Sequence, residues 1–292
     1  MSYLQNRKMN GGDWLNYSLI VLMSLVCIFP LLYVFSVSFT DPDAYRAFTF
    51  TLWPRKWSLA AYRYILSTSS FANSLRATAF VTIVGTALNL FFTYTFAYGL
   101  TRKGLPGRGI FLGAVFFTLI FNAGIVPNYL LVKSLGLLNT PWSLILFTLT
   151  NSWSLIVVKS FLQTLPMELE EAAIIDGCND VGVFFRIIVP LSGASIAAFT
   201  LFFAVSHWNS YFYPLMFISD SKKWMLQVLV KTLVIDSEAI AVGTAGSSEY
   251  GRIPDETIRL ASIMLAMAPI LVLYPFLQRY FVRGVMIGAI KG

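Results

Sequence analysis

Six long stretches of the chain contain no Asp, Glu, Lys or Arg. A single helix needs roughly 20 apolar residues to cross a hydrocarbon core of about 30 Å, and each stretch can supply them. A helix on the surface of a soluble protein would carry a polar face, which these stretches lack. The pattern therefore predicts an all-α integral membrane protein with about six transmembrane helices, over residues 14–40, 72–101, 109–132, 141–162, 187–213 and 258–280.

The composition of the chain agrees with this prediction. Of its 292 residues, 57% are hydrophobic and only 12% are charged, whereas an average soluble domain carries about 25% charged residues. The formal net charge is +7, but the basic side chains flank the apolar stretches instead of forming a stripe on one face. That distribution is typical of membrane topology, so we expect contact with membrane lipid and no nucleic-acid partner.

The positions of the basic residues also predict an orientation. Short cytoplasmic connections are enriched in Lys and Arg, and basic residues precede the first span, separate the second from the third and follow the sixth. The longer segments 41–71 and 220–258 contain basic residues too, but the rule is reliable only for short loops. We therefore expect both ends in the cytoplasm (N-in/C-in), with an N-terminal segment over residues 1–13, one transmembrane domain over residues 14–292 and a tail over residues 281–292.

The polar connection between the fourth and fifth spans, residues 163–190, has the pattern of two short helices joined at a glycine corner. Pro166 suits a first helical turn, and the carboxylates that follow it favour the positive end of a helix. Gly177 suits a C-terminal stop and Asp180 can cap the second helix, which runs towards Pro190. Such an elbow could seat against a partner protein, or it could be an ordinary loop with a solvated acidic face.

The same segment resembles a known family. Glu171-Ala172-Ala173, Gly177 six residues after Glu171, Ile187 and Val189-Pro190 are similar to the EAA loop of bacterial ABC importer permeases, with Val189 where Leu is usual. The resemblance implies the ABC type I importer permease fold, in which this loop forms a coupling helix that docks on a cytoplasmic ATPase. It assigns that coupling role to Glu170, Glu171, Ala172, Ala173, Asp176, Gly177, Ile187 and Pro190.

Further stretches are similar to carbohydrate permeases of the maltose-importer class. They are the C-terminal residues 278–292, the segment 208–215, and the pattern from residue 124 to residue 140. The resemblance implies half of a translocation pore in a bacterial cytoplasmic (inner) membrane, crossed several times by the chain. It implies four kinds of partner: a second homologous permease, two ATP-binding-cassette ATPase subunits, an external solute-binding protein and an oligosaccharide substrate.

Two finer expectations follow from this resemblance. The C-terminal residues Gly288, Lys291 and Gly292 would contact the ATPase, although a frayed terminus would look the same in sequence. The pattern around the third span is also similar to permeases for complex oligosaccharides, including uronic-acid polymers such as alginate. Selectivity would depend on the partner permease as well.

The chain lacks the motifs of an enzyme. It has no G-x-x-x-x-G-K-[ST] phosphate loop, so we expect no cofactor here and place ATP and magnesium in the partner ATPases. His207 is the only histidine and has no metal-ligand spacing to a cysteine, so we expect no metal site and interpret His207 as an interfacial side chain. The alternative function, a stand-alone secondary transporter or channel, would ordinarily need an ionisable residue in mid-membrane, and the six stretches contain no Asp, Glu, Lys or Arg.

Uncharged polar and aromatic residues within the spans are candidates for the substrate path. Polar groups that face lipid are costly, so they tend to face a bundle interior or a water-filled cavity. Amides can bind sugar hydroxyls while aromatic faces cover the apolar side of a pyranose ring. They could equally be interfacial belt residues and helix-packing amides. The candidates are Asn122, Asn128, Tyr129, Asn151, Trp153, Trp208, Asn209, Tyr211 and Tyr213.

Overall fold

The computed structural model describes residues 11–46, 52–243 and 255–289, and within these ranges the protein is built from helices, with a single isolated β-bridge between Thr40 and Trp57. The helices before the polar connection are α1 (Gly11–Ser38), α2 (Ala60–Ser67), α3 (Ser69–Thr101), α4 (Arg108–Ile120), α5 (Ile125–Ser134), α6 (Pro141–Phe147) and α7 (Ser152–Leu162). Those from the connection onward are α8 (Met167–Ile175), α9 (Asp180–Val183), the π-helical η1 (Phe184–Ile188), α10 (Val189–Leu191), α11 (Gly193–Trp208), α12 (Phe212–Phe217), the 3-10 turn η2 (Ser221–Lys223), α13 (Leu226–Gly243) and α14 (Asp255–Ala289).

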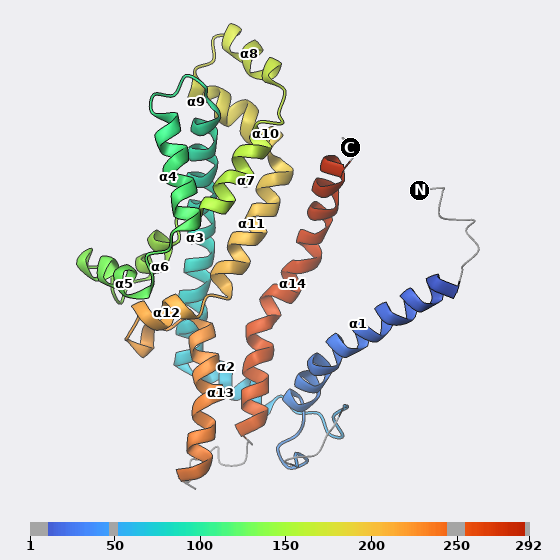
Figure 1. Cartoon of the computed structure of the whole chain (residues 1–292). Coiled ribbons are helices and arrows are strands. Elements are labelled where there is room, and N and C mark those ends of the chain that lie inside the picture. The colour runs from blue at the N-terminus through green and yellow to red at the C-terminus, as the bar shows by residue number, and fades with distance from the viewer. Residues whose placement is uncertain (1–10, 47–51, 244–254, 290–292) are drawn as a thin grey trace. The chain divides into compact units, whose positions relative to one another are not determined.

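The chain divides into two compact units. Unit one contains residues 1–68 and 232–267, and unit two contains residues 69–231 and 268–292. In unit two, the long helix α3 packs against α11, α7 and α6 (Figure 1). The polar connection, residues 163–190, belongs entirely to unit two.

Unit two has two apolar cores, one towards each end of α3. The first contains Tyr94, Ala97 and Leu100 of α3 and joins them to residues of α4, α7, α8, η1 and α11. The second surrounds Val81 of α3 and includes Ile145 of α6 and other residues of α5, α12 and α13. The polar connection therefore packs directly against α3, because the first core contains residues of both.

Several of the expected spans are broken. The expected span 109–132 is interrupted after α4, which is only 13 residues long, and Gly124 has a φ of +89° before α5 begins. The expected span 141–162 is divided into α6 and α7, which are bent by 51°, and residues 180–191 meet α11 at 81°. Helix α3 is close to its expected range, while α14 continues to Ala289, beyond the expected end at residue 280.

Helices α1 and α3 are long and apolar enough to cross a membrane, and so are the two bent pairs if each counts as one span. The count of six spans therefore stays a prediction. Large apolar side chains of α1 are exposed on all sides, with Leu15 at 70% and Val26 at 63%. Water would not tolerate such a surface on a single helix, whereas lipid would.

Candidate coupling helix and substrate cavity

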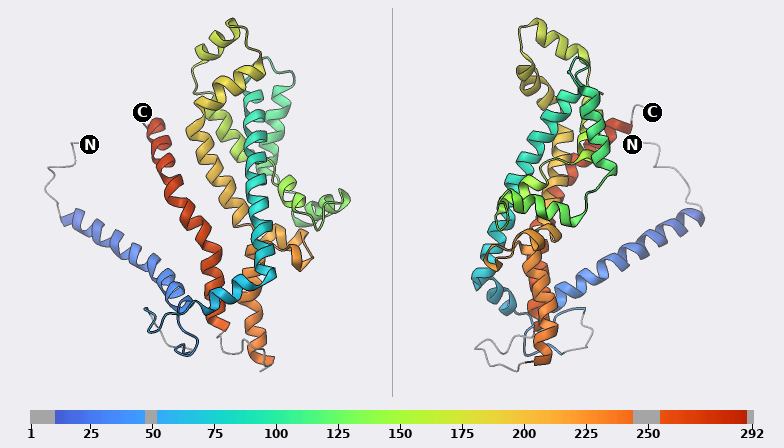
Figure 2. Two further views of the ribbon diagram at one scale, coloured as in Figure 1. Left: turned by 180° about the vertical axis from the view of Figure 1, so that it is seen from behind. Right: turned by 60° about the vertical axis from the view of Figure 1, so that its left-hand side comes forward.

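Helix α8 lies at one end of unit two, beyond the ends of α3, α4 and α7, in each of three views (Figures 1 and 2). Its first residue, Met167, follows Pro166, which occupies the N-cap position, and Glu168 and Glu170 lie in its first turn. Asp176 is the C-cap and Gly177 adopts a φ of +86°. A left-handed residue after the last turn ends a helix, so Gly177 has the stop function expected from sequence.

The second helix of the elbow has a different cap from the one expected. The side chain of Asn179, not that of Asp180, accepts a hydrogen bond from the backbone N–H of Gly182 at 2.8 Å. Asp180 is the first helical residue, where its charge favours the helix dipole. An asparagine preceding an aspartate offers two possible caps, and one residue of register decides between them.

The two faces of α8 differ in burial. Ala173 is 6% exposed and belongs to the first core, whereas its neighbour Ala172 is exposed. Ile175 is 85% exposed and Ile174 is 51% exposed. The acidic residues Glu171 and Asp176 are also exposed, as is Pro190, while Ile187 is half-buried. Helix α8 therefore presents an apolar and acidic surface that the described part of the chain leaves uncovered.

Glu170 has a partner within the chain. Its carboxylate forms an ion pair with the guanidinium of Arg102, at the end of α3. The Arg102 guanidinium also lies over the ring of Tyr98, 4.1 Å from the ring centroid. The hydroxyl of Tyr98 donates to the backbone carbonyl of Asp180 at 3.5 Å. These contacts connect the end of α3 to both helices of the elbow.

A cavity of about 450 Å³ lies among α3, α6, α7 and α11 in unit two. It falls within the range of roughly 300–1,000 Å³ that is usual for small-molecule sites. Asn151, Trp153 and Tyr213, all expected in the substrate path, line it. The other lining residues are Asn89, Phe147, Thr148, Thr150, Ser154, Phe202, Phe203, Ser206 and His207.

His207 is not an interfacial side chain, as the sequence had suggested, but is 6% exposed and lines this cavity. Its Nε2 lies 2.7 Å from Oδ1 of Asn89. The Nδ2 of Asn89 donates to the carbonyls of Thr148 and Leu149, at 2.5 and 3.0 Å, where the chain breaks between α6 and α7. Asn89 thus satisfies backbone groups that the break would otherwise leave unpaired.

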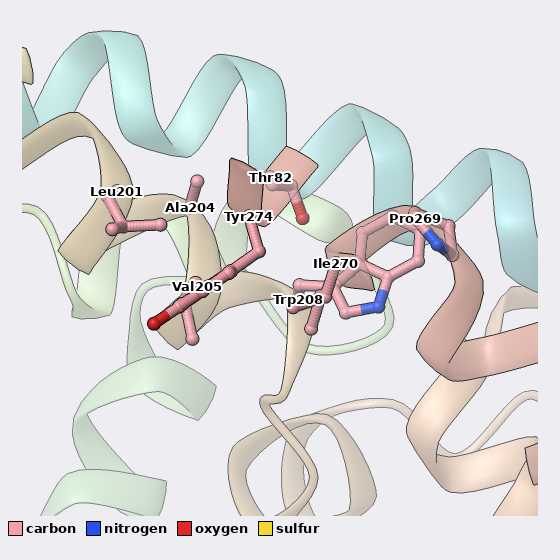
Figure 3. A pocket seen from close by; sticks show the side chains of 8 residues that line it. All are labelled: Thr82, Leu201, Ala204, Val205, Trp208, Pro269, Ile270 and Tyr274. Atoms are coloured by element: carbon pink, nitrogen blue, oxygen red, sulfur yellow. The ribbon is translucent and has the colours of Figure 1, made fainter. Parts of the chain in front are cut away.

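The remaining substrate-path candidates lie outside this cavity. Trp208 lines a small apolar pocket of about 50 Å³ between α3, α11 and α14, together with Thr82 and Tyr274 (Figure 3). Asn209 accepts a hydrogen bond from Gln227, and Tyr211 packs under the ammonium of Lys231. Asn122 accepts from the N–H of Gly124 between α4 and α5. Asn128 and Tyr129 are half-buried on α5.

Sequence reasoning missed Asn89, Ser206 and His207 as cavity residues. The available signal was an isolated polar residue in an apolar helix: Asn89 is the only amide in α3 apart from Asn73 in its first turns. Of the expected tail contacts, Gly288 falls within α14, while Lys291 and Gly292 lie outside the described residues. The described residues contain no cluster of three or more metal-ligating side chains.

The fold matches a solved structure of a membrane transporter. A crystal structure of a bacterial ABC transporter involved in the import of the acidic polysaccharide alginate contains a chain with a TM-score of 0.85 and 28% sequence identity. The match covers 94% of this chain and 100% of the other. The all-α fold is therefore that of an ABC importer permease, as the sequence predicted.

Two proteins of Bacillus subtilis are similar to this chain over nearly its whole length. The polygalacturonan/rhamnogalacturonan transport system permease protein YtcP is 42% identical over 96% of this chain and 98% of its own length. Protein LplC is 45% identical over 91% of this chain and 90% of its own length. No family model matches the chain. By these relatives, the chain belongs to the ABC transporter permeases for sugars and oligosaccharides, which are membrane proteins and not enzymes.

Proposed function

We propose that this chain forms one half of the pore of an ATP-driven importer for acidic oligosaccharides and that α8 is its contact with an ATPase subunit. The complete transporter would contain a second homologous permease, two ATPase subunits and an external binding protein that delivers the sugar. ATP and magnesium would bind to the ATPase subunits. Both ends of the chain and α8 would face the cytoplasm, and the chain would cross the inner membrane several times.

The exposed surface of α8 carries this proposal. Ile174 and Ile175 are large apolar side chains that none of the described residues covers, and the EAA pattern begins at Glu171 on the same helix. Apolar residues at the centre of a protein interface give most of its stability, while charges at the rim set its orientation. An ATPase groove that receives Ile174 and Ile175 and offers a basic group to Glu171 would fit this surface.

The route of force from α8 would run through two contacts. Ala173 holds α8 against the first core, and the Arg102–Glu170 ion pair ties it to the end of α3. Because packed elements move as units, a displacement of α8 would be passed to α3, which lines the cavity with Asn89. This gives a physical link between ATP-driven motion of a partner and the sugar site.

The substrate class is inferred from the relatives. YtcP is named for polygalacturonan and rhamnogalacturonan, and the matching crystal structure is a transporter of alginate. Both describe polymers that contain uronic acids. We therefore propose a uronate-containing oligosaccharide as the substrate and trigalacturonate as its test compound.

The test uses the complex purified with its partner subunits and reconstituted in liposomes with its binding protein. The wild type should take up trigalacturonate when ATP is supplied on the α8 side, and the loaded binding protein should stimulate ATP hydrolysis. The variant Ile175→Asp should lose the ATPase from the purified complex, because it places a charge in an apolar contact. Retention of the ATPase together with normal uptake in Ile175→Asp would refute the role of α8.

A further inference from the structure

The described side chains around the 450 Å³ cavity are polar or aromatic, and none of these is Asp, Glu, Lys or Arg. The aromatic rings form two groups. Trp153 packs against Phe202, with ring centroids 6.2 Å apart, and Phe147 packs against Tyr213 at 4.8 Å. Hydroxyl and amide groups of Thr150, Asn151, Ser154 and Ser206 complete the lining. The cavity therefore offers flat apolar faces and neutral hydrogen-bonding groups, which suit the hydroxyl-bearing edge and the apolar face of a sugar ring.

The hydrogen bonds of Asn89 determine where the proton of neutral His207 lies. Since Nδ2 of Asn89 donates to two carbonyls, its Oδ1 is the acceptor that faces His207. Nε2 of His207 must then carry the proton, and Nδ1 keeps its lone pair. Among the described residues, Nδ1 of His207 has no hydrogen-bond partner. His207 therefore has one acceptor left for a ligand.

Gly85 provides the space that places His207 in this position. A Cβ atom at residue 85 would lie 2.6 Å from Nε2 and 2.8 Å from Cε1 of His207. Such a distance is far below van der Waals contact, so any larger residue would displace the imidazole from Asn89. Three residues of two helices, Gly85 and Asn89 on α3 and His207 on α11, therefore hold the ring in one place.

Asn151 supplies a complementary donor. Its Oδ1 accepts the backbone N–H of Ser154 at 3.1 Å, as the N-cap of α7. This bond leaves Nδ2 of Asn151 as a donor beside the same cavity. A fixed acceptor on His207 and a donor on Asn151, between aromatic rings, can distinguish one orientation of a sugar ring from another.

We propose that this cavity is a subsite for one pyranose ring of the transported oligosaccharide, in which Nδ1 of His207 accepts a hydrogen bond from a ring hydroxyl. This inference rests on the proposed function. The subsite takes the hydroxyl-bearing edge of the ring, and the carboxylate that a uronate ring carries at its opposite edge must point out of the cavity. A carboxylate placed here would be desolvated without a cation among the lining residues, which is costly.

The test measures uptake of trigalacturonate by the reconstituted complex, together with ATP hydrolysis stimulated by the loaded binding protein. In His207→Leu, uptake should fall about five- to tenfold, the effect of losing one hydrogen bond to a ligand, while stimulated hydrolysis stays within twofold of the wild type. His207→Gln keeps a neutral donor and acceptor and should recover most of the uptake. His207→Lys, which has no acceptor, should resemble His207→Leu.

A matched pair of glycine variants tests the position of the ring. Gly85→Ala should lower uptake as much as His207→Leu, whereas Gly99→Ala, in the same helix with no atom within 4 Å of the added Cβ, should leave uptake unchanged. Equal effects of the two glycine variants would overturn the proposal.

Three other outcomes would also overturn it. Normal uptake in His207→Leu would exclude contact with the sugar. Uptake preserved in His207→Lys and lost in His207→Gln would mean that the site binds the carboxylate. Stimulated hydrolysis lost in proportion to uptake would mean that His207 only holds the helices together. A wild-type complex that does not take up trigalacturonate would instead refute the proposed substrate, and the subsite would fall with it.

Discussion

The guanidinium of Arg102 and the carboxylate of Glu170 form an ion pair that joins the residue directly after α3 to the first turn of α8. The Arg102 side chain is 30% exposed and the Glu170 side chain 14% exposed. Two further guanidinium nitrogens of Arg102, Nε and Nη2, are buried without a hydrogen-bond partner among the described residues. The ion pair and the contact with the Tyr98 ring therefore compensate for placing this charge against the protein.

Removal of either partner should loosen α8. Arg102→Ala and Glu170→Ala should each destabilise the complex by about 1–2 kcal/mol, less than a fully buried pair because solvent screens it. Uptake per ATP hydrolysed should also fall. The double variant should lose less stability than the sum of the losses in the two single variants, since each single variant removes the same interaction. Additive losses in melting temperature would show that the two residues act independently.

The backbone at Gly177 should also be sensitive to substitution. Gly177→Ala should lower the free energy of unfolding by about 1 kcal/mol, because a residue with a Cβ atom is strained at a φ of +86°. The added methyl group would meet no atom within 4 Å, so the cost would come from the backbone alone. Gly193→Ala, which lies in α11 and is also free of contacts, is the control. Equal melting temperatures for the two variants would contradict this explanation.

The neighbouring alanines of α8 should respond differently to enlargement. Ala173→Leu should destabilise the chain by about 1–3 kcal/mol, since it forces extra methyl groups into a packed core. Ala172→Leu should leave the melting temperature of the chain nearly unchanged, because Ala172 is exposed. If the proposed docking is right, Ala172→Leu should still weaken co-purification of the ATPase. Melting temperature and co-purification, measured for both variants, separate the two effects. An Ala173→Leu variant as stable as the wild type would contradict the expected overpacking of the core.

The long helix α3 could be predicted from sequence, but the breaks in other apolar stretches could not. An unbroken apolar run around residues 141–162 predicts one span, yet the chain breaks between α6 and α7. At this break Asn89, distant in sequence on α3, satisfies the carbonyls of Thr148 and Leu149. A contact of that kind depends on how helices pack. The same holds for Arg102 and Glu170, whose pairing no local pattern indicates.

Local signals performed better in the elbow. A proline, a run of acids and a glycine predicted α8 and its end, because each acts on the backbone within a few residues. The error was the cap of the second helix, where Asn179 replaced Asp180. In the cavity, Asn151, Trp153 and Tyr213 were expected, whereas His207 was misjudged because an isolated histidine gives no sign of its burial.

Labelling from outside the cell can test the orientation of α8. Ile175 is 85% exposed at the end of α8, so a cysteine there would be open to a reagent from its own side of the membrane. In a background with Cys27 and Cys178 replaced by serine, Ile175→Cys should resist a membrane-impermeant maleimide in intact cells or spheroplasts. It should react after the membrane is opened, unless a bound ATPase covers it, in which case reaction should follow removal of the ATPase.

A cysteine at Trp53, which is 67% exposed in the connection between α1 and α2, provides the matched control. With the N-terminus in the cytoplasm, this connection lies outside, and Trp53→Cys should react in intact cells. One helix separates Trp53 from the N-terminus, and the proposed function puts α8 on the N-terminal side, so the two labels should report opposite sides of the membrane. Rapid labelling at residue 175 from outside would place α8 away from any cytoplasmic ATPase, and the proposed coupling through the EAA segment would then be untenable.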